Sequence, residues 1–162
     1  MFKKILVPLD GSELAAKVLP YVIDLAKTHD SQITLLYVFY AGVSETFPNW
    51  IEEALEKEKK SCELSLAKAA KDLEDQGVKE VKVECLEGSP AREIITYAKD
   101  NGMDLIAMAT HGKGEVAWVL GSVAAKVVSH ATVPVLLFRV IFPKPLQTKE
   151  DYFLEVLERG IP

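Results

Sequence analysis

The sequence predicts one α/β domain, built as an open, doubly wound sheet of five parallel strands with helices on both faces. The chain has 162 residues, enough for one domain with a sizeable core, and 49% of them are apolar. Strand-like and helix-like segments alternate along it, and most strand-like runs are short and continuously apolar. Such runs are typical of strands buried on both faces, and helix-length connections join parallel strands.

The first strand covers residues 5–9, a short apolar run that ends at a turn containing Asp10. A helix is expected over residues 12–29, where apolar side chains recur at helical spacing. Either Asp10 or Ser12 could cap its first turn, because both side chains accept hydrogen bonds from backbone N–H groups. Pro20 lies within the helical pattern and predicts a kink or a split there, since proline lacks an N–H donor.

The second strand is expected over residues 33–40, and a loop over residues 41–48 follows it. Asn49 then opens a long helix, with Glu52 three residues later as the partner in a capping box. Gly77 is expected just beyond the end of this helix, since glycine commonly follows a helix C-terminus. The apolar residues of the helix keep to one face and are Ile51, Leu55, Cys62, Leu66, Ala69, Ala70 and Leu73.

The third strand, residues 81–86, alternates between polar and apolar residues, so we expect it near an edge of the sheet. Ser89 and Pro90 begin the next helix as its N-cap and its first residue, and that helix ends at residues 101–102. The pattern is completed by a strand over residues 104–109, a helix over residues 123–131 and a strand over residues 133–138.

The alternating pattern predicts a domain over residues 1–140, followed by a C-terminal extension over residues 141–162 in which one short helix could form.

Composition limits the classes of function. A formal net charge of −5 argues against a nucleic-acid surface, which needs clustered lysine and arginine. No apolar run approaches the roughly 18 residues of a membrane-spanning helix, and no secretory signal is recognised. Cys62 and Cys85 form no Cys-x-x-Cys pair, so we expect two reduced thiols in a cytoplasmic protein.

Two loops are suited to bind a ligand at one end of the predicted sheet. In an open α/β sheet, ligands bind beyond the carboxyl ends of the strands, where the strand order reverses. In a Rossmann-like order of 3-2-1-4-5, the loop over residues 8–12 faces the loop over residues 109–114, after the fourth strand. The second loop contains glycines and leads towards a helix start, and such loops are common phosphate cradles.

Each candidate residue in these loops has a binding role and an ordinary structural alternative. Asp10 would accept hydrogen bonds from ribose hydroxyls. Gly112, Gly121 and Ser122 would donate hydrogen bonds to phosphates, and Val38 would offer backbone groups and an apolar wall to a base. Equally, Asp10 and Ser122 could each be a helix N-cap, and the glycines could serve close packing alone.

Neither a catalytic constellation nor a resident metal is predicted. His111 is a lone histidine on a loop, a position that is most often solvated, and no nucleophile or carboxylate accompanies it at a recognisable spacing. No set of histidine, cysteine and carboxylate residues has metal-ligand spacing. The glycine-bearing loop matches neither the P-loop nor the dinucleotide fingerprint.

Four segments carry a resemblance to a known family. Residues 4–12 are Lys-Ile-Leu-Val-Pro-Leu-Asp-Gly-Ser, and residues 104–112 are Asp-Leu-Ile-Ala-Met-Ala-Thr-His-Gly. Gly-Ser-Val follows at residues 121–123 and Val-Pro-Val-Leu at residues 133–136. With these segments the chain resembles the universal stress protein family over about residues 1–140. The resemblance implies the strand order given above, usually a dimer, and a regulatory or stress-protective role rather than catalysis.

Many members of that family bind ATP through a Gly-x2-Gly-x9-Gly-Ser/Thr motif, and members without the motif do not. Here Ala109 replaces the first glycine, and eight residues rather than nine separate Gly112 from Gly121. Alanine adds a methyl group where backbone should approach phosphates, and the missing residue shifts the loop by up to roughly 3.5 Å. Because Asp10, Gly112 and Gly121 remain, ATP or another adenine nucleotide is still expected, with or without magnesium. The expected binding residues are Pro8, Asp10, Val38, Ala109, His111, Gly112, Lys113, Gly121, Ser122 and Val123.

Lys113 could make a charge-assisted contact to a phosphate, or its side chain could simply be solvated.

For the whole chain, a nucleotide-binding regulatory module is the favoured function. Ala109 and the shortened loop support an alternative, a protein-interaction module of the same fold without nucleotide. An enzyme such as a slow ATPase or a nucleotidyl transferase is least favoured, because no acidic metal ligand accompanies the glycine-bearing loop.

A homodimer through the fifth strand is the expected assembly. Residues 133–140 are apolar and would lie at the edge of the sheet, where an uncovered strand tends to pair with another. Alternatively, residues 141–162 could fold back and cover this edge. An unidentified protein partner stays open, whereas nucleic acid and membrane partners are not expected.

Overall fold

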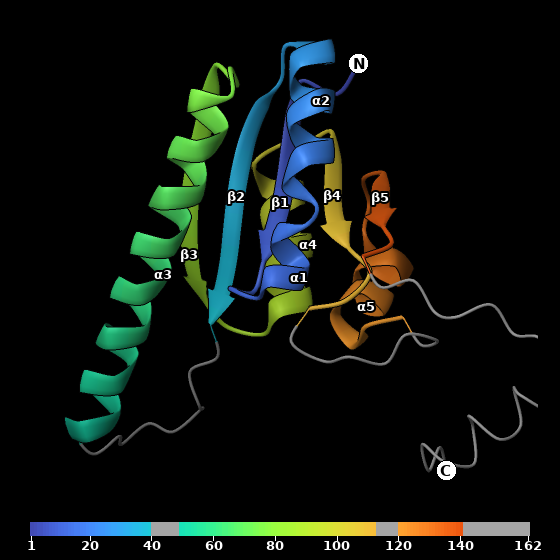
Figure 1. Cartoon of the computed structure of the whole chain (residues 1–162). Helices are drawn as coiled ribbons and strands as arrows, with labels where there is room; N and C mark the ends of the chain where they lie inside the picture. The colour runs from blue at the N-terminus through green and yellow to red at the C-terminus, as the bar shows by residue number, and fades with distance from the viewer. Residues whose placement is uncertain (40–48, 113–119, 141–162) are drawn as a thin grey trace, which may run out of the picture.

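The computed structural model describes residues 1–39, 49–112 and 120–140, which contain a five-stranded parallel sheet (Figure 1). The strand order is β3-β2-β1-β4-β5, which confirms the predicted order. The strands are β1 (Lys4–Leu9), β2 (Gln32–Phe39), β3 (Glu80–Glu87), β4 (Leu105–Ala109) and β5 (Val135–Phe138). Because the order reverses between β1 and β4, the carboxyl ends of these two neighbouring strands open the crevice in which ligands bind in such sheets.

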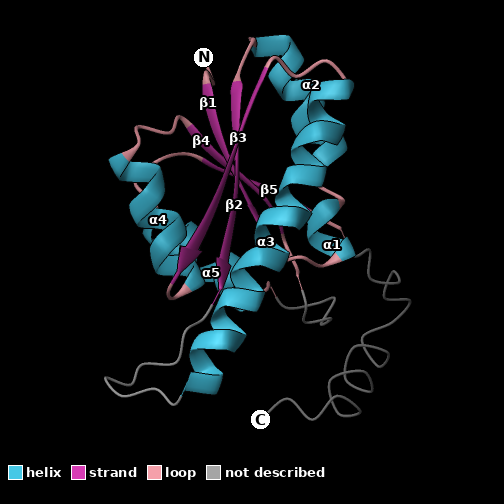
Figure 2. Cartoon of the chain, turned by 90° about the vertical axis from the view of Figure 1, so that its left-hand side faces the viewer, coloured by secondary structure: helices cyan, strands magenta, loops and turns pink. Residues whose placement is uncertain are grey.

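Helices cover both faces of the sheet, as predicted. Figure 2 shows the sheet nearly edge-on, with α4 and α5 on one side and the remaining helices on the other. The helices are α1 (Glu13–Ala16), α2 (Leu19–His29), α3 (Asn49–Asp75), α4 (Pro90–Asp100) and α5 (Ser122–His130).

The helix predicted over residues 12–29 is split into α1 and α2, and Pro20 lies in the first turn of α2. A proline is tolerated there because the first N–H groups of a helix have no intrahelical partner. Ser12 is the N-cap of α1, and its Oγ accepts a hydrogen bond from the Ala15 amide at 3.1 Å. Of the two alternatives for this cap, the structure therefore supports Ser12 and not Asp10.

Other elements agree with the sequence to within a few residues. The long helix α3 begins at Asn49 and ends at Asp75, just before Gly77, whose φ of +93° suits glycine. Strand β3 lies at an edge of the sheet, as its alternation predicted. Ser89 and Pro90 occupy the N-cap and the first turn of α4, although Ser89 makes no side-chain capping bond.

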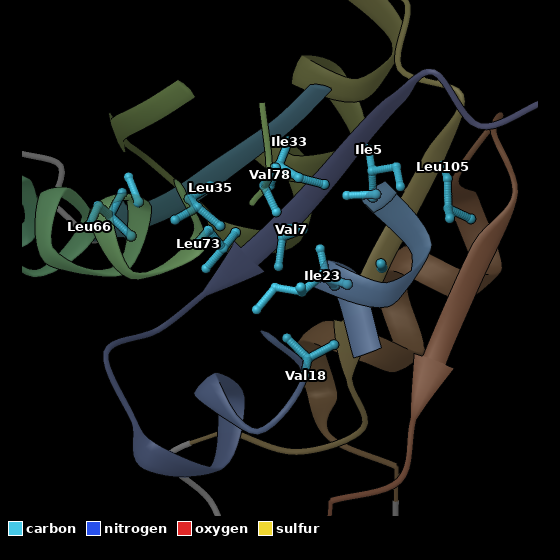
Figure 3. Close-up of a cluster of buried hydrophobic side chains, with 14 of the residues drawn as sticks. Ile5, Val7, Val18, Ile23, Ile33, Leu35, Leu66, Leu73, Val78 and Leu105 are labelled. Atoms are coloured by element: carbon cyan, nitrogen blue, oxygen red, sulfur yellow. The ribbon is translucent and has the colours of Figure 1, made fainter. Parts of the chain in front are cut away.

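Two apolar clusters, one on each face of the sheet, form the core. Successive residues of β1 point to opposite faces, so Ile5 and Val7 join one cluster while Leu6 joins the other. All three side chains are completely buried, which confirms the interpretation of the continuous apolar run. Figure 3 shows the first cluster, whose labelled members are Ile5, Val7, Val18, Ile23, Ile33, Leu35, Leu66, Leu73, Val78 and Leu105.

The two cysteines are joined. Cys62 of α3 and Cys85 of β3 form a disulfide with an S–S distance of 2.02 Å, and their Cα atoms are 6.5 Å apart. The prediction of two reduced thiols is therefore wrong. A separation of 23 positions carries no pairing signal, and the residues meet because α3 packs along β3 (Figure 1).

Several predictions concern residues outside the described part of the chain. These are the loop over residues 41–48, the capping role of Glu52, the contact of Lys113 and the helix in residues 141–162. Among the described helices, none is long and apolar enough to cross a membrane.

Candidate functional site

A cavity of about 290 Å³ lies at the carboxyl ends of the central strands, the lower end of the sheet in Figure 1. Part of its lining is apolar and consists of side chains from β2, α4 and β4. Further apolar residues come from β1, α1 and the first turn of α5, and the polar groups come mainly from the loops after β1 and β4. The combination of an apolar wall with a few polar groups is typical of a small-molecule site. The apolar wall includes Leu36, Val38, Pro90, Ile94 and Met108, and the polar groups are Asp10, Thr110, His111, Gly112, Gly121 and Ser122.

Every predicted site residue within the described ranges lines this cavity. The first loop and β2 contribute some of them, while β4, the second loop and α5 contribute the others. The sheet order brings them together, because β1 lies between β2 and β4. The predicted residues in the lining are Pro8, Asp10, Val38, Ala109, His111, Gly112, Gly121, Ser122 and Val123.

Asp10 links the two loops. Its Oδ1 accepts hydrogen bonds from the Ser12 amide at 2.9 Å and the Ser12 hydroxyl at 2.6 Å, so the carboxylate is held in a tight turn. Its other oxygen lies against Gly112 of the second loop. A Cβ atom on Gly112 would lie 2.8 Å from Asp10 Cγ and closer still to Oδ2, which no real side chain tolerates. Any larger residue at position 112 would therefore force the Asp10 carboxylate or one of the two loops to shift.

Gly121 lies directly before α5 and brings the chain back to the end of β4. Its amide donates a hydrogen bond to the Thr110 carbonyl at 3.0 Å, and a Cβ atom here would lie 2.9 Å from that oxygen. Gly121 is also the N-cap of α5, so the alternative that Ser122 is the cap is wrong. Ser122 instead begins the helix and lines the cavity together with Val123 and Ala124. The N-terminus of α5, whose first amides have no partner within the helix, thus lies at the cavity.

His111 is buried, with 5% of its surface exposed, so its interpretation as a solvated loop histidine is wrong. Its Nδ1 lies 2.9 Å from the Thr110 hydroxyl. Burial follows from the return of the chain, since the Cβ position of Gly121 lies only 3.6 Å from the His111 Cα. Sequence position alone could not show that return.

Several lining residues were not predicted. Leu9 and Thr110 lie inside the two predicted loops, and Met108 and Ala124 are direct neighbours of predicted residues. Pro90 and Ile94 carry no such signal, because α4 reaches the cavity through its packing against α5 and β2, elements distant from it in the chain. The unpredicted lining residues are Leu9, Ala15, Leu36, Pro90, Ile94, Met108, Thr110 and Ala124.

The described part of the site is equipped for hydrogen bonding rather than for direct metal ligation. Within residues 1–39, 49–112 and 120–140, no three histidine, cysteine or carboxylate side chains gather closely enough to hold a metal ion. The polar groups around the described part of the cavity are the Asp10 carboxylate, the His111 ring, the Thr110 and Ser122 hydroxyls and the first amides of α5. These groups suit a ligand that carries both hydroxyl donors and an anionic group.

The model of the universal stress protein family matches residues 1–139. The chain belongs to this family. Universal stress protein MJ0531 of Methanocaldococcus jannaschii is 37% identical over 145 residues, which cover 86% of this chain and 83% of the relative. Universal stress protein YxiE of Bacillus subtilis is 33% identical over 149 residues, covering 86% of this chain and 100% of the relative.

Solved structures of universal stress proteins share the fold. That of MJ0577 from Methanocaldococcus jannaschii has a TM-score of 0.79 and 31% identity, and the match covers 88% of this chain and 99% of that one. A universal stress protein in complex with cAMP matches with a TM-score of 0.68 at 16% identity, covering 86% and 98%. One from Archaeoglobus fulgidus in complex with dAMP matches with a TM-score of 0.59 at 22% identity, covering 85% and 98%.

Proposed function

We propose that this universal stress protein is a regulatory module that binds an adenine nucleotide in the cavity between the loops after β1 and β4. The observation that carries the proposal is the convergence of Asp10, Gly112 and Gly121 at one end of a largely apolar cavity. Universal stress proteins with the same fold have been solved with cAMP and with dAMP, and both ligands contain adenine, a sugar and a phosphate.

The lining suits each part of such a ligand. The apolar wall with Val38 and Met108 would cover the flat base. The Asp10 carboxylate would accept hydrogen bonds from sugar hydroxyls, in a position fixed by its bonds to Ser12. Phosphate would lie near the glycines and the first turn of α5, where bare backbone and the helix dipole favour an anion.

Of the two departures from the family motif, Ala109 belongs to the described part of the chain, whereas the shortened loop falls mostly in residues 113–119, outside it. Ala109 is the last residue of β4 and is 6% exposed, so its methyl group forms part of the buried wall. The close contacts at Gly112 and Gly121 are independent of it. The site therefore keeps the two glycines that border the cavity, and we propose ATP, ADP or AMP as the ligand class. Magnesium would join through the phosphate oxygens, which are its usual partners.

We propose binding without turnover. Phosphoryl transfer needs positioned phosphates, a metal and a group that orients the nucleophile. Around the cavity, the described side chains that could take part are Asp10 and His111. The Asp10 Oδ1 is already engaged by two bonds from Ser12, and the His111 ring is buried against Thr110. These contacts support a role in holding a ligand and a loop rather than in activating water.

The test is mass spectrometry of small molecules released by denaturing the purified protein, together with calorimetric titration of the stripped protein with ATP, ADP and AMP, with and without magnesium. We expect saturable binding that Asp10→Ala weakens by at least about tenfold, since a hydrogen bond to a charged group is lost. Asp24→Ala, on the exposed side of α2, is the matched control and should bind normally. A folded protein that ignores all three nucleotides would favour the nucleotide-independent interaction module.

A further inference from the structure

The disulfide is located where α3 first becomes fully buried against the sheet. Residues 56–61 of the helix are exposed, whereas Cys62 is 4% exposed. Beyond it, Leu66, Ala70 and Leu73 are buried at helical spacing. Cys62 is thus the first fully buried side chain of α3 among those described, and its partner Cys85 lies half-buried in the edge strand β3. The disulfide ties the middle of a long helix to the edge of the sheet.

From Cys85, a short line of contacts leads to the loop that carries Asp10. Cys85 is paired with Tyr37 of β2, and Tyr37 is paired with Leu9 of β1, so the three side chains share one face. The Tyr37 ring lies 3.4 Å from the Cβ position of Gly11, the residue after Asp10. One aromatic side chain therefore separates the disulfide from the first loop of the candidate site.

A second connection reaches the apolar wall of the cavity. Three residues beyond Cys85, the Gly88 amide donates a hydrogen bond to the Phe39 carbonyl at 2.9 Å, which holds the ends of β2 and β3 together. Val38 directly precedes Phe39, and Pro90 follows Gly88 by two positions. Both residues line the cavity. The position of the edge strand near Cys85 therefore affects two sides of the candidate site.

We propose that Cys62 and Cys85 form a redox-sensitive clamp. The clamp sets how ordered the segments after β1 and β3 are and, through them, the affinity of the cavity for nucleotide. The affinity part of this proposal depends on the proposed function. In the oxidised protein α3 holds β3, and Tyr37 is fixed beneath Gly11. In the reduced protein this covalent tie is absent, and the loops open more often. Because coupling between two sites is reciprocal, bound nucleotide also makes the disulfide harder to reduce.

The chemistry is thiol–disulfide exchange with a low-molecular-weight dithiol. A thiolate of the dithiol attacks Sγ of Cys85, the more exposed of the two residues, and the S–S bond breaks with Cys62 leaving as a thiolate that takes up a proton. The second thiol of the reagent then attacks the mixed disulfide and releases Cys85 as a thiol. Two electrons and two protons pass from the dithiol to the protein, and the reagent becomes a cyclic disulfide. A low-molecular-weight disulfide reverses the process.

The clamp is tested on the ligand-free full chain by hydrogen exchange, comparing the oxidised protein with protein treated with excess dithiothreitol. Amides of residues 9–12 and 86–90 should exchange about fivefold faster or more after reduction, the lower end of typical coupling between sites. In parallel, calorimetric titration should give a Kd for ATP or AMP about fivefold higher or more in the reduced protein. The double variant Cys62→Ala/Cys85→Ala is the control and should not respond to dithiothreitol.

Each outcome decides a separate part of the proposal. Unchanged exchange around the cavity, or a disulfide that excess dithiothreitol fails to reduce in the folded protein, overturns the clamp. Faster exchange with equal nucleotide affinity in both states overturns the coupling and leaves the proposed function intact. Faster exchange without nucleotide binding in either state supports the clamp and counts against the proposed function alone. A response of the double variant to dithiothreitol also contradicts the clamp.

Discussion

At the scale of single residues, Gly112 and Asp10 touch where the two loops of the site meet. In Gly112→Ala the new methyl group would overlap the Asp10 carboxylate. Either the Asp10 carboxylate would have to leave its place or the loops would have to separate, at a cost of about 1–3 kcal/mol for an overpacked contact. We expect nucleotide affinity to fall by at least about tenfold, measured by calorimetry with ATP and AMP.

Gly102→Ala is the matched control for this prediction. Gly102 has a φ of +59°, so alanine there is strained, but its Cβ would meet no atom within 4 Å. It should lower stability by about 1 kcal/mol and leave nucleotide affinity unchanged. Equal affinity of Gly112→Ala and wild type would contradict the contact between the loops as the basis of binding.

Individual residues also show the limits of reading the site from sequence. Asp10, Gly112 and Gly121 were found because anion binding needs those residue types in loops after neighbouring strands. The burial of His111 was missed, since it depends on where the chain returns at Gly121. Pro90 was assigned to a helix start, and nothing in its surroundings in the chain indicates that α4 closes the cavity.

At the scale of elements, an exposed ion pair joins the end of α2 to the turn before β3. Lys79 Nζ lies 2.6 Å from Asp30 Oδ1, and their side chains are 80% and 62% exposed. The hydrogen bond from Lys79 and its charge lower the pKa of Asp30 below the usual 3.8. A carboxyl with a lowered pKa in the folded state adds stability above pH 3.8, and this contribution disappears as the pH falls through the lower value.

We therefore expect Asp30→Asn to be slightly less stable than wild type near neutral pH, and equally stable in strong acid. Asparagine suits the left-handed backbone at this position, where φ is 53°, so the comparison isolates the charge. Thermal melts from neutral pH to below pH 3.8 at low salt check the prediction. Since exposed pairs are weak and screened, the gap should also close in high salt. A gap that is constant with pH would contradict this role of the charge.

At the scale of the whole molecule, β5 forms one edge of the described sheet, and we propose that two copies pair through it. Leu136 on this strand is 37% exposed, whereas Phe138 is covered by Tyr21 of α2, with the ring centroids 4.8 Å apart. Leu136→Lys should raise the dissociation constant of the dimer by at least about tenfold, because an apolar contact is replaced by a desolvated charge. Sedimentation over a range of concentrations measures it.

Leu64→Lys is the control for the β5 edge. Leu64 is 74% exposed on α3, which packs against β3 and β2 at the opposite edge of the sheet. It should leave the oligomeric state unchanged. A wild-type chain that stays monomeric at all concentrations would contradict pairing through β5, and a dimer sensitive only to Leu64→Lys would move the interface to α3.

The fold was predictable as a whole because its signals are local. Continuous apolar runs mark β1, β2 and β4, and these strands are buried on both faces. Boundaries were less certain: β5 begins at Val135 rather than at residue 133, since Pro134 has no N–H and joins the sheet only through its carbonyl, which accepts from Ile106. The disulfide was not predictable, because it depends on a helix packing against a strand far along the chain.

The position of β1 between β2 and β4 also has a consequence for synthesis on the ribosome. Strands β1, β2 and β3 are made first and can pair at once, but β1 then keeps one open edge until β4 appears. The backbone bonds from Lys3 and Lys4 to the Asp104 carboxylate, at 2.8 and 2.9 Å, span about a hundred positions of the chain. At typical translation rates the stretch of chain from β1 to β4 takes roughly 5–20 s to synthesise. During that time an apolar central strand is available to other nascent chains, and the newly made half of the sheet is a natural client for chaperones.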